Sequence, residues 1–91
     1  MEIKVAIVNK HTEKFIVQID SSKEWWTNIY SAGDTVPVSG IYKCKGCKKE
    51  ITSNKNDPFP PQNHHQHTAL AGKIEWQLIV RTDTDGNNCG L

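Results

Sequence analysis

The stretch Ile41-Tyr42-Lys43-Cys44-Lys45-Gly46-Cys47 decides the fold, because a β-rich run leads there into a Cys-x-x-Cys turn. A short return strand is expected at Glu50-Ile51-Thr52-Ser53. We expect the turn to fold both sulfurs to one side, with Gly46 tolerating the positive φ that so tight a turn can require. Two convergent thiolates make half of a tetrahedral zinc site and need further ligands to close it.

Candidates for those further ligands follow in a histidine-rich loop. His64, His65 and His67 come after Cys47, and the spacing C-x2-C-x16-H-x2-H fits the two-knuckle template with histidine in its second half. Adjacent His64 and His65 point apart in extended backbone, so only one of them is expected to be a ligand. His67 can pair with His64 across a turn or with His65 on one face of a strand. The sequence therefore predicts Zn²⁺ bound by Cys44, Cys47 and two of the three histidines.

The size of the chain gives a metal a structural purpose. Its 91 residues are 36% hydrophobic, enough for one domain with a small core, and small cores often need a disulfide, a metal or a partner subunit. Three cysteines suit a disulfide framework poorly, and no βαβ pattern supports a thioredoxin-like redox pair. His11, alone in a turn, and Cys89, in the polar tail, are fallback ligands only. With no signal peptide and no membrane-spanning stretch recognisable, we expect a cytoplasmic protein without a membrane partner.

Outward from the metal stretch, the chain is typical of a β domain. Residues 2–8 and 14–19 predict a hairpin that turns at residues 9–13, and residues 21–30 favour a short helical turn with a Ser21–Glu24 capping box. Residues 73–80 predict a last strand with one apolar face, formed by Ile74, Trp76, Leu78 and Val80. We therefore expect a mostly β fold: one small antiparallel domain over residues 1–91, with an N-terminal hairpin and linker (1–32), a metal region (33–80) and a flexible tail (81–91).

From Gly33 onward the chain resembles a zinc-ribbon (rubredoxin-like) family of small bacterial and phage proteins. The matching stretches are Gly33-Asp34, Pro37, Ser39-Gly40-Ile41-Tyr42-Lys43-Cys44-Lys45-Gly46-Cys47, Glu50-Ile51-Thr52, Phe59-Pro60-Pro61 and Trp76-Gln77-Leu78. In that family a second Cys-x-x-Cys follows the Phe-Pro-Pro, and here Gln62 and His65 stand at its two cysteine positions. The resemblance covers residues 33–80 and implies a zinc ribbon with His65 as a ligand, whereas spacing alone favours His64 with His67.

The favoured function is a non-enzymatic zinc-binding module, whose closed four-ligand site supports a surface that binds another protein. A metal-dependent hydrolase is the least favoured alternative, because Glu50 or Asp57 would have to act as a base and no H-E-x-x-H motif is present. An iron electron carrier normally needs four thiolates, which three cysteines cannot supply.

Nucleic-acid binding is the second alternative. Four lysines crowd the Cys-x-x-Cys turn, and three aromatic side chains elsewhere offer surfaces on which bases could stack: Lys43, Lys45, Lys48 and Lys49, with Trp25, Trp26 and Phe59. The net charge of only +1 and the single arginine, Arg81, argue against this function.

Overall fold

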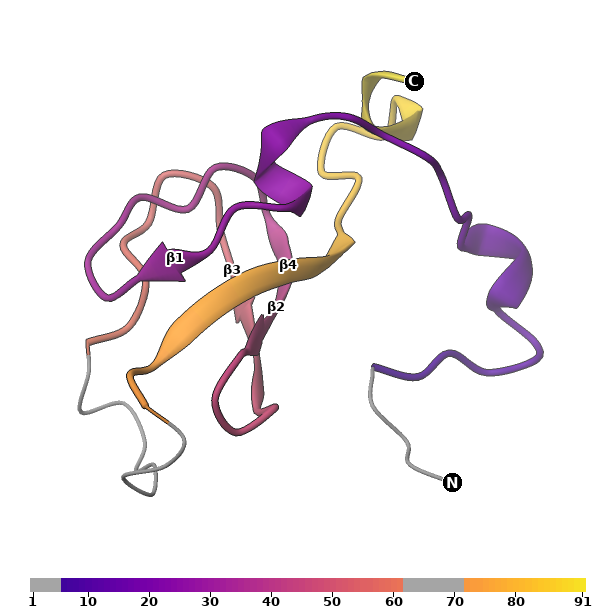
Figure 1. Cartoon of the computed structure of the whole chain (residues 1–91). Coiled ribbons are helices and arrows are strands. Elements are labelled where there is room, and N and C mark those ends of the chain that lie inside the picture. Colours follow the sequence, from indigo (N-terminus) through magenta and orange to yellow (C-terminus); the bar gives the residue numbers. More distant parts are fainter. Residues whose placement is uncertain (1–5, 62–71) are drawn as a thin grey trace.

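The computed structural model of this protein describes residues 6–61 and 72–91 (Figure 1). In those residues the regular structure is a four-stranded sheet and three single 3-10 turns. In chain order these are η1 (Glu13–Phe15), η2 (Glu24–Trp26), β1 (Tyr30–Ser31), β2 (Gly40–Cys44), β3 (Glu50–Ser53), β4 (Glu75–Arg81) and η4 (Asn88–Gly90). The predicted mostly β fold with a small antiparallel sheet is confirmed.

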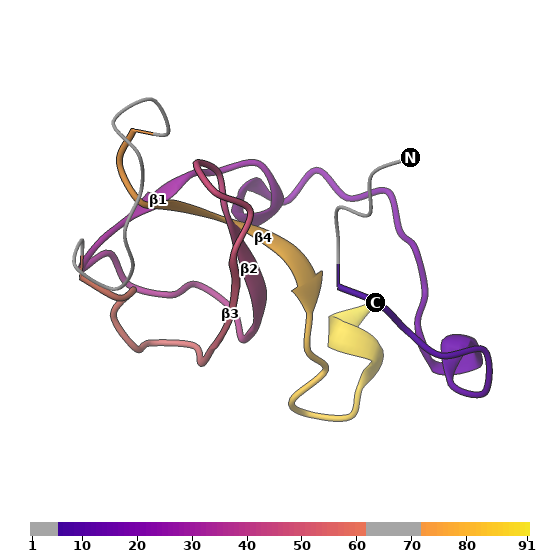
Figure 2. The same cartoon turned by 90° about the horizontal axis from the view of Figure 1, so that it is seen from below.

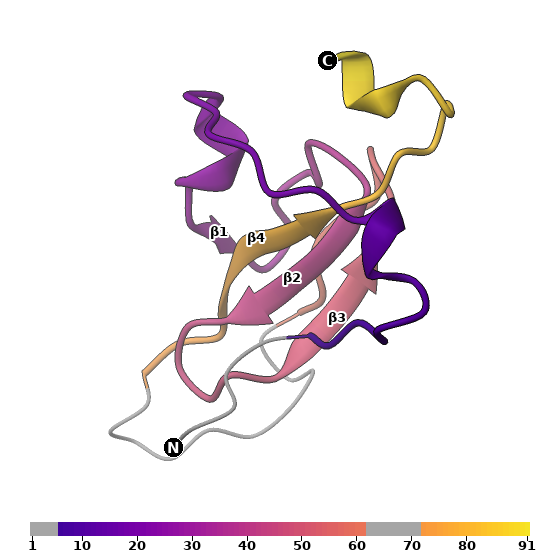
Figure 3. The same cartoon turned by 90° about the vertical axis from the view of Figure 1, so that its right-hand side faces the viewer.

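The sheet has the order β1-β4-β2-β3, and every neighbouring pair is antiparallel (Figure 3). β2 and β3 form a hairpin in which Lys43 lies opposite Glu50. β4 pairs with β2 along its length, from Cys44 opposite Trp76 to Gly40 opposite Arg81. The hairpin that carries the Cys-x-x-Cys turn is therefore fastened to the sheet through β4.

The core lies on one face of the two central strands. Alternate residues of β2 are buried, and the predicted apolar face of β4 is buried except for the half-buried Val80. The buried set is Val36, Val38, Tyr42, Cys44, Phe59, Ile74, Trp76 and Leu78. Aromatic rings fill much of it, with Phe59 stacked on Tyr30 at 5.1 Å and edge-on to Tyr42 at 4.9 Å between ring centroids. Such aromatic pairs stabilise beyond the area they bury.

Tyr42 brings a polar hydroxyl into the core, where it has a hydrogen-bond partner. Its hydroxyl donates a hydrogen bond of 2.6 Å to the carbonyl of Val38. Burial raises the pKa of Tyr42 to about 12, so the phenol stays protonated and able to donate at neutral pH.

Replacing Tyr42 with phenylalanine is therefore expected to lower the free energy of unfolding by about 1–2 kcal/mol, because the Val38 carbonyl stays buried without its donor. Denaturant unfolding measures this loss. Tyr30→Phe is the matched control, since that ring is only partly buried and its loss should be smaller. Equal losses in the two variants would contradict the role given to the Tyr42 hydroxyl.

The predicted N-terminal hairpin is not formed in the described residues. Residues 6–9 have no regular structure, and the strand expected at 14–19 is replaced by η1 followed by residues without regular structure. The carbonyl of Asn9 accepts hydrogen bonds from the N–H groups of Thr12 and Glu13 at 2.9 Å each, which winds the chain into a tight turn. β-rich residues form a strand only when a neighbouring strand completes the ladder, and residues 11–20 are all exposed.

The short helical turn expected within residues 21–30 is present as η2, but its predicted capping box is not. The residue before η2 is Lys23, and no side chain caps the turn. The Ser21 hydroxyl instead accepts a hydrogen bond of 3.2 Å from the N–H of Lys23.

The C-terminal residues turn around one carboxylate. Asp83 accepts hydrogen bonds from the N–H groups of Asn87, Asn88 and Cys89 at 2.9–3.2 Å. These groups, Cys89 foremost, together with the N–H of Gly86, hold the pKa of Asp83 below its usual value. No helix in residues 6–61 and 72–91 is long and apolar enough to cross a membrane.

Candidate metal centre

Three backbone hydrogen bonds hold the Cys-x-x-Cys turn in place. The N–H of Lys48 donates to the carbonyl of Cys44 at 2.9 Å and closes the turn. The N–H of Cys44 donates to Lys49 at 2.6 Å, and the N–H of Lys45 donates to Glu75 at 2.8 Å. The turn is therefore tied to the start of β4 as well as to the hairpin.

The expectation that Gly46 would carry the positive φ of this turn is wrong. The left-handed residue is Lys48, with φ 66°. The chain must reverse after the second cysteine to enter β3, so the unusual backbone angle falls one residue beyond Cys47. A non-glycine residue with this angle carries a conformational cost of about 1–2 kcal/mol, which the closing hydrogen bond to Cys44 helps to offset.

The two sulfurs lie in different surroundings. Cys44 belongs to the core and is 1% exposed, whereas Cys47 is half-buried and packs against the core. Burial acts to raise the pKa of the Cys44 thiol, but the backbone N–H groups of Cys47, Gly46 and Glu75 donate to its sulfur and bring the pKa below its ordinary value. N–H groups directed at a sulfur stabilise the thiolate, which is the form that binds a metal.

The three histidines of the predicted site lie outside the described residues. His64, His65 and His67 fall within residues 62–71, so their membership of the site stays a prediction. The chain returns from that segment beside the turn, because Glu75 accepts the N–H of Lys45. His67 precedes Glu75 by eight residues, which can span up to about 28 Å. The loop is long enough to bring histidines to the sulfurs.

Within residues 6–61 and 72–91, no group of three or more histidine, cysteine or acidic side chains could hold a metal ion. A four-ligand site on Cys44 and Cys47 within one chain would therefore draw its other ligands from outside the described residues, where residues 62–71 contain three histidines. The Cys-x-x-Cys turn fits its half of such a zinc site, because both sulfurs come from one turn whose N–H groups stabilise thiolate.

Neither fallback ligand lies near the turn. Cys89 is in η4 at the far end of the sheet, where its carbonyl accepts a hydrogen bond of 3.4 Å from Arg81 (Figure 1). Arg81 ends β4, whose seven residues extend about 20 Å from the turn. His11 precedes η1, which also lies away from the turn in Figures 1 and 3.

The lysines around the turn are partly engaged with the sheet. Lys43 forms an ion pair of 2.9 Å with Glu50, one of the two carboxylates considered as a hydrolytic base. Lys45 donates to the side chain of Gln77 at 3.2 Å. Lys48 and Lys49 are exposed. The basic patch that nucleic acid would need is thereby reduced.

The aromatic side chains considered for base stacking are also less available than expected. Phe59 is 2% exposed and belongs to the core, so it offers no surface to a base. Trp25 and Trp26 are half-buried. The ring of Trp25 is already covered by the guanidinium of Arg81, 5.3 Å from its centroid, and by the ammonium of Lys23 at 5.7 Å.

The fold and the turn define a small all-β domain with a Cys-x-x-Cys turn at one end of its sheet. No protein-family model matches the chain, and no solved structure is significantly similar to it. The chain is 55% identical over 87 residues to Protein L of Escherichia coli, an alignment that covers 96% of this chain and 99% of Protein L. The chain belongs to the same family as Protein L.

Proposed function

We propose that this protein is a non-enzymatic zinc-binding module. Cys44, Cys47 and two of the three histidines at positions 64, 65 and 67 bind one Zn²⁺, and the metal stabilises a domain whose surface binds another protein. The observation that carries the proposal is the Cys-x-x-Cys turn, in which backbone N–H groups lower the pKa of a buried thiol. In a buried site without a metal, those N–H groups would favour a thiolate that has no counter-charge.

A structural role fits the position of the turn better than a catalytic one. Cys44 is part of the core, so the core would shield a metal bound to its sulfur from water on that side. Four protein ligands leave no vacant coordination position for substrate or water. Zinc here would supply cross-linking between the turn and the loop and would take no part in a reaction.

The metal cross-link would restrain the longest connection between consecutive strands of the sheet, the one from β3 to β4. The turn joins β2 to β3, while the segment that holds the histidines separates β3 from β4. Ligands from both would fix the start of β4 against the hairpin. With only eight buried core residues among those described, such a constraint would contribute a large share of the stability.

Metal analysis of the purified full-length chain tests the proposal. We expect about one zinc per chain in the wild type, and loss of zinc in Cys44→Ser and Cys47→Ser because each removes a ligand. Single alanine variants at His64, His65 and His67 should show two that lose zinc and one that keeps it.

Cys89→Ser is the matched control, because it removes the third thiol at the opposite end of the sheet and should keep its zinc. A wild-type chain purified without metal that also fails to take up added Zn²⁺ would overturn the proposal. So would full zinc content in a Cys44→Ser/Cys47→Ser double variant.

A further inference from the structure

The N-terminal segment exposes more apolar side chain than a folded chain usually leaves to water. Among the described residues its exposed large apolar side chains are Ile7 (83%), Val8 (55%), Phe15 (75%), Ile16 (54%), Val17 (74%) and Ile19 (39%). In Figures 1 and 2 this segment runs to one side of the sheet. Exposed large apolar side chains concentrated on one segment point to an interaction site.

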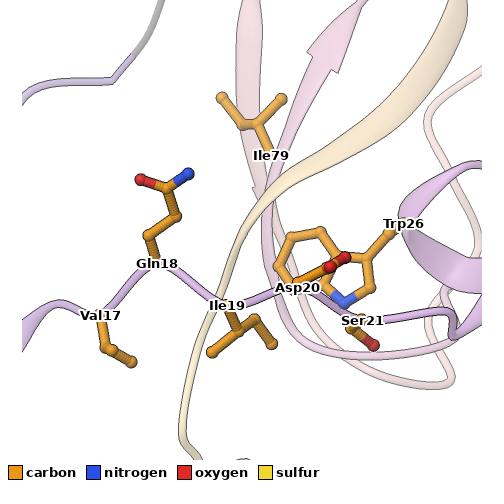
Figure 4. A pocket seen from close by; sticks show the side chains of 7 residues that line it. All are labelled: Val17, Gln18, Ile19, Asp20, Ser21, Trp26 and Ile79. Carbon is orange, nitrogen blue, oxygen red and sulfur yellow. The ribbon is translucent and has the colours of Figure 1, made fainter.

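Residues 16–20 of this segment have no regular structure, and their backbone groups from residue 17 onward are open to pairing. Ile16 has extended backbone angles (φ −112°, ψ 134°). In the part of the chain that the structure describes, the N–H and C=O groups of residues 17–20 form no hydrogen bond with protein. Figure 4 shows the side chains of Val17 and Ile19 on one side of the chain and that of Gln18 on the other. An unpaired strand with one apolar face is a template for another strand.

The segment stands off from the rest of the protein. A hollow of about 340 Å³ lies between residues 17–21 and the side chains of Trp26 and Ile79 (Figure 4). A wider groove of about 1210 Å³ shares most of this lining and continues past Trp25 to Leu91. The monomer therefore leaves the apolar side chains of this segment without close packing.

We propose that residues 14–20 of two copies of this chain pair as antiparallel strands about a twofold axis through Val17, and so make the protein a homodimer. In this register Phe15 of each copy lies opposite Ile19 of the other. Lys14 of each copy lies opposite Asp20 of the other, which gives two pairs of opposite charge. The contact is isologous, because each copy offers the same residues.

Neighbouring registers lack this match. A shift of one residue toward the N-terminus sets Phe15 opposite Gln18 and places the carboxylates of Glu13 and Asp20 opposite each other. A shift of one residue the other way sets Phe15 opposite Asp20. Both alternatives lose the Phe15–Ile19 and Lys14–Asp20 pairs, and the first also sets like charges opposite each other. The proposed register has one kind of apolar–polar pair, Ile16 opposite Gln18, and is favoured by its other pairs.

The available area suits a weak dimer. The exposed large apolar residues of the pairing segment, Phe15, Ile16, Val17 and Ile19, present roughly 400 Å² in each copy. Two copies can therefore bury roughly 800 Å², the size of a weak or transient protein–protein contact.

The proposed strand pairing requires only a small rearrangement of the chain, the unwinding of η1. Lys14 and Phe15 lie in η1, which has no buried residue and no side-chain cap. Unwinding this single turn breaks only the hydrogen bonds that Phe15 and Ile16 donate to Thr12 and Glu13. The new strand ladder forms more backbone hydrogen bonds than are lost.

A charge-swap series on the full-length chain tests the dimer and its register, with mass measured by light scattering over a wide range of protein concentration. The wild type should reach about twice the 10.3 kDa chain mass. Lys14→Glu alone and Asp20→Lys alone should each weaken the dimer by about tenfold or more, since two attractive pairs become repulsive. The double variant should restore the wild-type affinity, and Val17→Lys should give a monomer.

Lys10→Glu is the matched control, because it changes the net charge as Lys14→Glu does but lies outside the pairing segment. All substituted residues are exposed, and thermal melts of the variants establish that each one folds. A wild type that stays monomeric at every concentration overturns the proposal. A dimer that persists in Val17→Lys, or that the charge swap fails to restore, overturns it equally.

Discussion

Replacing Gly40 with alanine is expected to lower the free energy of unfolding by about 3 kcal/mol or more. A Cβ at this position would meet the backbone carbonyl of Val80 on the neighbouring strand, far inside van der Waals contact. It would also touch the side chain of Leu78 and the Cα of Arg81. A backbone atom in the middle of a sheet cannot turn away as a flexible side chain can, so β2 and β4 would have to separate.

The added methyl group would weaken the pairing of β2 with β4, which attaches the β2–β3 hairpin to the rest of the sheet. Gly40 lies opposite Arg81, next to the irregularity between Ile41 and Tyr42 where the register of β2 and β4 shifts. A loss of this size is a large fraction of the stability of a small domain and should lower the midpoint of a thermal melt by 10 °C or more, by order-of-magnitude scaling of about 4–8 °C per kcal/mol.

Gly33→Ala separates steric cost from backbone conformation. Gly33 has a φ of +84° and nothing within 4 Å of an added Cβ, so alanine there meets only the left-handed backbone penalty of about 1–2 kcal/mol. A Gly40→Ala variant no less stable than Gly33→Ala would contradict the close approach of β2 to β4.

Removing zinc is expected to lower the thermal midpoint of the wild type by well over 10 °C. A ligand that binds only the folded chain stabilises it by about 4 kcal/mol when its free concentration is about 1,000 times its Kd. For a domain of this size that corresponds to a shift of about 15–30 °C. The comparison is between melts in excess chelator and in excess free Zn²⁺.

The Cys44→Ser/Cys47→Ser variant controls for effects of the chelator itself, and its melt should be the same in both conditions. A wild-type melt that chelator leaves unchanged would mean that metal contributes nothing to this fold. Acid should act as chelator does, because protons compete with zinc for thiolate and imidazole.

The central hairpin and β4 were predictable because their signals are local. Alternation in residues 41–44 and 73–80, with a tight turn between cysteines, needs no knowledge of distant contacts. β1 was missed because it is two residues long and exists only through its pairing with Trp76 and Glu75. Its residues carry no pattern of their own.

The core contribution of the proline-rich segment was also invisible in the sequence. Phe59 is buried because two loops pair: its N–H donates to Asp34 at 2.8 Å and its carbonyl accepts from Gly33 at 3.1 Å. From the sequence, Phe59 was expected in a proline-rich loop, with its ring available for a base to stack on. Tertiary contacts of this kind override local preference.

The strand expected at residues 14–19 shows the opposite error. Phe15, Ile16, Val17 and Ile19 have the side chains of a strand, but propensity records what a segment prefers when a partner is beside it. The candidate metal site also combines features that the sequence predicted with one that it did not. Turn chemistry identified Cys44 and Cys47, while the left-handed Lys48 was not foreseeable, because lysine has no preference for that backbone angle.

The register of the sheet also orders the events of folding. Lys43 and Glu50 are only seven residues apart, so the hairpin that holds both cysteines closes a short loop. Trp76 lies 32 residues after its partner Cys44, and closing the longer loop costs more chain entropy. During synthesis, the hairpin can form while β4 is still inside the ribosome. Both thiols are then accessible before the strand that buries Cys44 is available, and a metal bound to them, as proposed above, would protect them against oxidation.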